Sequence, residues 1–299
     1  MFKPVYLALL LALGGAPAMA RPVAAMPSAV VSDPRVDAAF PARMIAFQLP
    51  SDGVLLNAVM YVAAGRGPHP TLLLFHGFPG NEQNLDLAQA ARRAGWNVLT
   101  LHYRGSWGSP GSFSYAHCIE DARNAARFLH DPAFAAKAQI DTSRLAVAGH
   151  SMGGMMAARA MADVPGFLGA FLIDPWDMGT EGRTIRNPAA LKAFREQELD
   201  GDLPPLAGTS AEALIGELQA DPPEFDLHAT VTKISAHPLS LNYATRGLGA
   251  GYQGMVASAR AARPAALTTS LTATDHSFSD KRIWLAARLA RWLGSLPVK

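Results

Sequence analysis

The chain has 299 residues, 49% of them hydrophobic, and a formal net charge of +2 at pH 7. Such a small net charge gives no basic field for nucleic acid or for an anionic lipid surface, so we expect neither as a partner. Because Cys118 is the single cysteine, an intrachain disulfide is excluded and stability has to come from packing.

Residues 1–20 have the pattern of a secretory signal. Lys3 precedes the nine apolar residues Val5–Leu13, and small residues in an A-x-A arrangement end at Ala20. Nine residues are too few to span a hydrocarbon core of roughly 30 Å as a helix, so we expect no stable membrane anchor. The sequence therefore predicts cleavage after Ala20, export to the periplasm or the medium, and one domain formed by residues 21–299.

The rest of the chain alternates apolar segments with segments of helical spacing. Two strands joined by the turn signal PSDG are expected within residues 44–64, and further apolar segments predict strands over 71–77, 97–105, 144–150, 169–174, 239–244 and 266–276. Helices are predicted over 81–94 and 115–130, after residue 151, and at the C-terminal end. This alternation predicts an α/β fold whose mostly parallel central sheet has helices on both faces and its ligand site at the carboxyl ends of the strands.

Between about 177 and 237 this regularity stops. The segment is polar, is interrupted by prolines and contains a helix or two. We interpret it as a helical insertion over the strand ends, which would act as a lid that shapes the pocket and excludes water.

The hexapeptide GHSMGG at 149–154 directly follows the apolar run RLAVA. A G-x-S-x-G sequence between a strand and a helix allows a sharp turn, which needs small neighbours at Gly149 and Gly153 and lifts Ser151 above the sheet edge. There the hydroxyl lies at a helix N-terminus, whose free N–H groups favour a developing negative charge. The pattern predicts Ser151 as a nucleophile.

Together with FHGFPG (75–80), HYRGSWGSPG (102–111) and TDHSFSD (274–280), this motif makes the chain resemble the α/β-hydrolase superfamily. The likeness covers nearly all of the mature chain and is greatest to the dipeptidyl aminopeptidase/acylaminoacyl-peptidase-like and serine aminopeptidase-like hydrolases. The resemblance implies that His276, after the last strand, is the general base and that the backbone amides of Phe78 and Met152 form the oxyanion hole. These motifs indicate the superfamily but not the substrate.

The acid of the triad is where the sequence departs from the family pattern. It normally follows the strand at 239–244, where this chain has Thr245 and Arg246 instead. A carboxylate at the end of the preceding strand can hold the imidazole tautomer equally well, and there we favour Asp174, with Asp177 as the alternative. Asp275, Asp280 or no acid at all remain open.

No other motif competes with this chemistry. The sequence has no zinc-binding HExxH or Cys/His cluster and no phosphate-binding glycine loop, so we expect no metal and no cofactor. We predict an exported serine hydrolase of small-molecule esters, with amides or peptides as the nearest alternative. A non-catalytic binding protein of the same fold and an acyltransferase with the same triad are the rivals. Acidic residues of the insertion would favour substrates with a free amine if they line the site entrance; they are Glu196, Glu198, Asp200 and Asp202.

Overall fold

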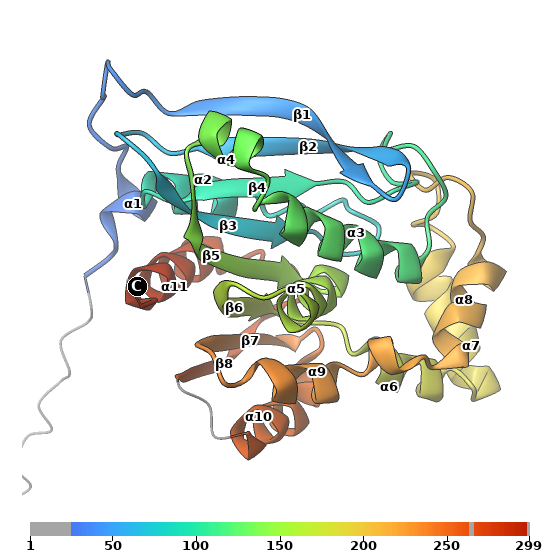
Figure 1. The fold of residues 1–299 in the computed structure, drawn as a ribbon. Coiled ribbons are helices and arrows are strands. Elements are labelled where there is room, and N and C mark those ends of the chain that lie inside the picture. The colour runs from blue at the N-terminus through green and yellow to red at the C-terminus, as the bar shows by residue number, and fades with distance from the viewer. Residues whose placement is uncertain (1–24, 263–265, 298–299) are drawn as a thin grey trace, which may run out of the picture.

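The computed structural model describes residues 25–262 and 266–297, and the predicted signal sequence lies outside these ranges. Within them, eight strands form one sheet in the order β1-β2-β4-β3-β5-β6-β7-β8 (Figure 1). The pairs β1–β2 and β2–β4 are antiparallel, and the other five are parallel. This sheet confirms the predicted α/β fold. The strands are β1 (Arg43–Ser51), β2 (Val54–Val62), β3 (His69–Phe75), β4 (Asn97–Leu101), β5 (Ile140–His150), β6 (Phe167–Ile173), β7 (Leu239–Arg246) and β8 (Leu267–Asp275).

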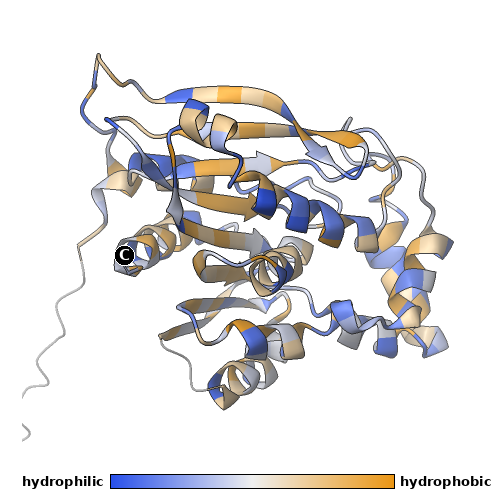
Figure 2. Cartoon of the chain, in the orientation of Figure 1, coloured by the Kyte–Doolittle hydropathy of each residue, from blue (hydrophilic) through white to orange (hydrophobic). Residues whose placement is uncertain are grey.

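Burial of the strands follows their position in the sheet. Every residue of β3 and β6 is buried, because helices cover both faces of these central strands. The edge strand β1 instead has exposed residues interleaved with more buried ones. Its hairpin with β2 turns at Asp52 and Gly53, whose positive φ values of 42° and 82° are those that a two-residue hairpin loop requires. Figure 2 shows the hydrophobic residues gathered in the central strands.

Helices form a layer on each face of the sheet (Figure 1). On one face α2 (Leu85–Arg93) and α11 (Arg282–Ser295) pack together beside α1 (Ser28–Val31). The other face carries α3 (Tyr115–Phe128), α4 (Pro132–Ala138), α5 (Met152–Asp163), α9 (Leu227–Ile234) and α10 (Tyr252–Ala261). No helix in the described ranges is both long and apolar enough to cross a bilayer.

The segment after β6 lies beyond the carboxyl ends of the parallel strands (Figure 1). It contains α6 (Met178–Thr184), α7 (Pro188–Phe194), a π-helix (Arg195–Leu199), α8 (Ala211–Ala220) and a 3₁₀ turn (Pro223–Phe225). The next helix, α9, packs on α5 beside the sheet, so the part over the strand ends stops before residue 227. Two backbone hydrogen bonds tie this part to the loop after β4: Ala207 donates to Gly105 at 2.7 Å and accepts from Phe113 at 2.8 Å.

Candidate active site

The predicted nucleophile occupies a strained turn between β5 and α5. Ser151 has φ 55° and ψ −124°, and the helix begins at the next residue. A Cβ on Gly149 would lie 1.9 Å from the Gly153 carbonyl oxygen, and a Cβ on Gly153 would lie 2.3 Å from that of Phe75. Only glycine fits at either position: at Gly149 because the turn folds back on it, and at Gly153 because the end of β3 runs beside it.

Asp174 and His276 form a hydrogen-bonded pair. The His276 Nδ1 lies 2.7 Å from the Asp174 Oδ2, and the Asp174 side chain is fully buried at the end of β6. Backbone N–H groups of Ala244 and Leu248 donate to the same carboxylate at 3.0 and 2.9 Å. Donors on both oxygens stabilise the ionised carboxylate, which in turn requires His276 to carry its proton on Nδ1 and leaves Nε2 free to accept one.

The segment that lacks the usual acid has a different use here. In ATRGLGAG (244–251) the chain passes so close to the pair that a Cβ on Gly247 would lie 2.1 Å from the Asp174 Oδ2 and 3.0 Å from the His276 Cα. The loop therefore supplies two N–H donors and a close approach in place of a carboxylate. Sequence reasoning identified the missing acid but not this role of Gly247.

The alternative acids lie elsewhere. Asp177 caps α6 by accepting from the Thr180 N–H at 3.2 Å, and its other oxygen lies 3.3 Å from the His228 Nε2. Asp275 and Asp280 accept hydrogen bonds within the last strand and the loop after it. The structure brings none of these three carboxylates to the His276 ring.

His150, inside the turn motif, supports the backbone of His276. Its Nε2 donates to the His276 carbonyl at 2.9 Å, and the two rings lie 4.5 Å apart between centroids. Burial lowers the pKa of His150 to about 3, so the ring is neutral at physiological pH. The two residues are 126 positions apart, and no local pattern in the sequence predicts this contact.

The predicted oxyanion donors flank the nucleophile. A Cβ on Gly77 would lie 3.0 Å from the Ser151 Cβ, so the loop after β3 rests against the serine and brings the Phe78 amide there. Met152 is the first residue of α5, where an N–H has no partner within the helix. His76 Nδ1 donates to the Gly77 carbonyl at 2.7 Å. Because that carbonyl and the Phe78 N–H belong to one planar peptide group, this bond also orients the donor.

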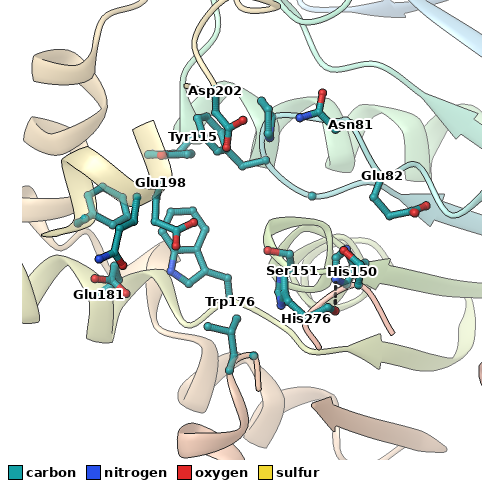
Figure 3. A pocket seen from close by; sticks show the side chains of 18 of the residues that line it. Asn81, Glu82, Tyr115, His150, Ser151, Trp176, Glu181, Glu198, Asp202 and His276 are labelled. Carbon is teal, nitrogen blue, oxygen red and sulfur yellow. Dashed lines mark hydrogen bonds between the residues drawn. The ribbon is translucent and has the colours of Figure 1, made fainter. Parts of the chain in front are cut away.

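Ser151, His276, His150 and Phe78 line one cavity of about 660 Å³. Figure 3 shows Ser151, His150 and His276 together on one side, Glu181 and Glu198 of the insertion on the other, and Trp176 between them. Within the described residues the Ser151 hydroxyl and the His276 ring form no hydrogen bond, which is common in unliganded enzymes of this kind. The same residues include no cluster of three or more potential metal ligands.

Known proteins share parts of this sequence. The profile of the α/β hydrolase fold family matches residues 70–223. An α/β hydrolase domain-containing protein of Arabidopsis thaliana, WAV2, is 32% identical over 126 residues, which is 42% of this chain and 39% of that protein. Cutinase 2 of Thermobifida cellulosilytica is 35% identical over 63 residues, which is 21% of this chain and 24% of the cutinase. Both matches therefore span less than half of the relative's length.

Solved structures show the same fold across most of the chain. An esterase of Pyrococcus furiosus matches with a TM-score of 0.60 and 17% identity over 88% of this chain and 97% of its own. An esterase of Pyrobaculum calidifontis gives 0.63 and 17% over 86% and 87%. Dipeptidyl peptidase 4 of Porphyromonas gingivalis gives 0.60 and 15% over 86% of this chain but 36% of its own. At such identities the likeness shows the fold alone.

Proposed function

Because this chain belongs to the α/β-hydrolase fold family, we propose that it is a serine hydrolase that cleaves carboxylic esters through an acyl-enzyme on Ser151. The observation that carries the proposal is the Asp174–His276 hydrogen bond, at 2.7 Å, in the cavity that Ser151 also lines. The esterases and cutinase among the similar proteins support an ester as the bond cleaved. An alkoxide also leaves more readily than an amine, which favours esters over amides.

In the proposed reaction the Ser151 Oγ attacks the ester carbonyl while the His276 Nε2 accepts the hydroxyl proton. The negative oxygen of the tetrahedral intermediate accepts hydrogen bonds from the Phe78 and Met152 backbone N–H groups. His276 then protonates the departing alcohol, which leaves an acyl group on Ser151. Water enters, loses a proton to the same nitrogen and releases the carboxylic acid. Throughout, Asp174 holds the imidazole orientation and stabilises its protonated form.

Two further parts of the proposal concern regions outside the catalytic residues. We propose that residues 178–225 act as the lid of this cavity, since Glu181, Phe194 and Glu198 line it from that side. We also propose that residues 1–20 direct export and are removed after Ala20. Intact-mass measurement of protein recovered from the periplasm or medium tests export. A product that still begins at residue 1 would contradict it.

Fluorophosphonate labelling tests the nucleophile. A single adduct in the purified mature protein, absent in Ser151→Ala, is expected together with turnover of p-nitrophenyl butyrate. No adduct and no turnover in a folded sample would overturn the proposal in favour of a binding protein. The rival acyltransferase activity would appear as ester or amide products when alcohols or amines are added.

A further inference from the structure

The end of the cavity opposite Ser151 carries three carboxylates: Glu181, Glu198 and Asp202. None of them forms a salt bridge with any cation in the described residues. Burial raises the pKa of Glu181, which the nearby charges of Glu198 and Asp177 raise further, and burial likewise raises the pKa of Asp202. Burial is the main cause of the raised pKa at both carboxyls.

Neighbouring acidic residues of the insertion are instead paired with cations and lie outside the cavity. Glu196 lies 3.8 Å from the Lys192 ammonium, and Asp200 lies 3.4 Å from the Arg195 guanidinium, and neither lines the cavity. The acidic stretch that the sequence singled out therefore divides into carboxylates that are paired with cations outside the cavity and unpaired carboxylates that line it, of which Glu198 is exposed to solvent. Of its four members, Glu198 and Asp202 face the cavity.

Aromatic rings form the walls between these carboxylates. Trp176 lies close enough to Glu181 to lower the pKa of its carboxyl, and it stacks on Phe194, with ring centroids 6.2 Å apart and an interplanar angle of 28°. Tyr115 meets the Trp176 ring edge-on, with centroids 5.5 Å apart. Figure 3 shows Trp176 between Glu198 and Ser151, and the Trp176 backbone N–H donates to the Ser151 carbonyl at 3.0 Å.

Tyr115 supplies an independent sign of a missing ligand. It lines this cavity, its side chain is fully buried, and its hydroxyl has no hydrogen-bond partner among the described residues. A buried hydroxyl without a partner is costly, and a ligand with N–H donors would satisfy it.

We propose that this subsite, formed by Glu181, Glu198, Trp176 and Tyr115, binds a primary alkylammonium group of the substrate. The ammonium supplies the positive charge that the carboxylates lack, three N–H donors for carboxylate and hydroxyl oxygens, and a cation for the aromatic faces. Arg246, the arginine that lines the cavity, is the last residue of β7 and pairs in register with Asp275, at the catalytic end. The inference rests on the proposed esterase activity and names its preferred substrates as esters that carry a free amine.

Matched pairs of substrates test the subsite. We would measure kcat/KM for p-nitrophenyl esters of straight-chain ω-amino acids, each paired with the ester in which a methyl group replaces the ammonium group. The readout is the ratio within a pair, so a general loss of activity cancels. The ratio should favour the ammonium ester in the wild type and fall about tenfold in the Glu181→Gln/Glu198→Gln double variant. Glu196→Gln, which removes a carboxylate outside the cavity, should leave the ratio unchanged.

If the double variant fails to fold, a measurement on the unmodified protein still tests the inference. Hexylammonium should inhibit hydrolysis of a neutral ester more strongly than hexanol does, and equal inhibition would overturn the inference. A ratio that is the same in the wild type and a folded double variant would also overturn it. These outcomes differ from failure of the esterase proposal, in which neither ester of a pair is hydrolysed and Ser151 is not labelled.

Discussion

Gly247→Ala should disable the acid of the triad without changing any catalytic side chain. The added Cβ would lie 2.1 Å from the Asp174 Oδ2, whereas real contacts of a Cβ are essentially never shorter than 3.0 Å. The backbone at residue 247 is not left-handed, so alanine is strained only by its close contacts with Asp174 and with the His276 Cα at 3.0 Å. Asp174 or the loop must therefore retreat by about 1 Å.

The expected loss in kcat follows from the hydrogen bonds that this displacement disturbs. The displaced oxygen accepts from both the Leu248 N–H and the His276 Nδ1, at 2.9 and 2.7 Å, and both hydrogen bonds lengthen together. A misplacement of about 1 Å in a catalytic group costs about 10²-fold in rate. We expect kcat for p-nitrophenyl butyrate to fall by about that factor, less than the ~10⁴-fold loss expected when the acid no longer fixes the tautomer.

Gly251→Ala is the matched control in the same loop. Its Cβ would meet nothing within 4 Å, and its φ of −78° suits any residue, so activity and thermal stability should stay near those of the wild type. Thermal unfolding of both variants separates local displacement from a general loss of fold. A folded Gly247→Ala variant with kcat within about threefold of the wild type would refute the reasoning.

Three other predictions concern single side chains. Asp174→Asn should lower kcat by about 10⁴-fold with the fold retained. Asp177→Asn, which alters a helix cap and a contact with His228 but none with His276, should leave kcat within about twofold. Equal losses in steady-state assays would contradict the choice of acid. His150→Phe removes the donor to the His276 carbonyl and should lower kcat about tenfold. His150→Gln keeps a donor of similar reach and should restore most of the rate. Equal rates in the two variants would show that His150 only fills space. Burial lowers the pKa of His76 to about 4 and that of His150 to about 3, so below pH 6.5 the unfolded chain binds more protons than the folded one. The free energy of unfolding, measured with urea, should then fall by about 2 kcal/mol per histidine between pH 7 and pH 5, and a flat profile would show that the rings are not buried in neutral form.

The strands of the sheet could be predicted because buried strands consist of consecutive apolar residues. Central parallel strands such as β3 and β6 are buried on both faces and therefore appear as continuous apolar runs. Helix α10 was not predicted, since Tyr252–Ala261 contains a glycine and small residues and has only a weak apolar stripe. Helix α9 falls in the segment assigned to the insertion, and only its packing on α5 shows that it belongs to the layer beside the sheet.

The same contrast between local sequence features and contacts of distant residues holds at the site. The position of Ser151 follows from its own neighbours, because the clashes that demand Gly149 and Gly153 arise within or beside one turn. The choice of acid instead depends on contacts between residues about 70 to 100 positions apart, which bring Asp174 to the end of β7 and to His276. No period or spacing in the sequence encodes such a contact. That is why Asp174 and Asp177 could not be separated by sequence reasoning alone.

Leu248 has two separate roles, one through its backbone N–H and one as a residue that lines the cavity. Its backbone N–H holds the Asp174 carboxylate at 2.9 Å, while the residue also forms part of the cavity wall. Every amino acid except proline has that N–H, so position 248 can be varied to retarget the enzyme to other substrates while the acid stays in place. Phe78 has the same division between a backbone donor and a residue that lines the cavity. These two positions are therefore where a library that seeks new substrate ranges should begin.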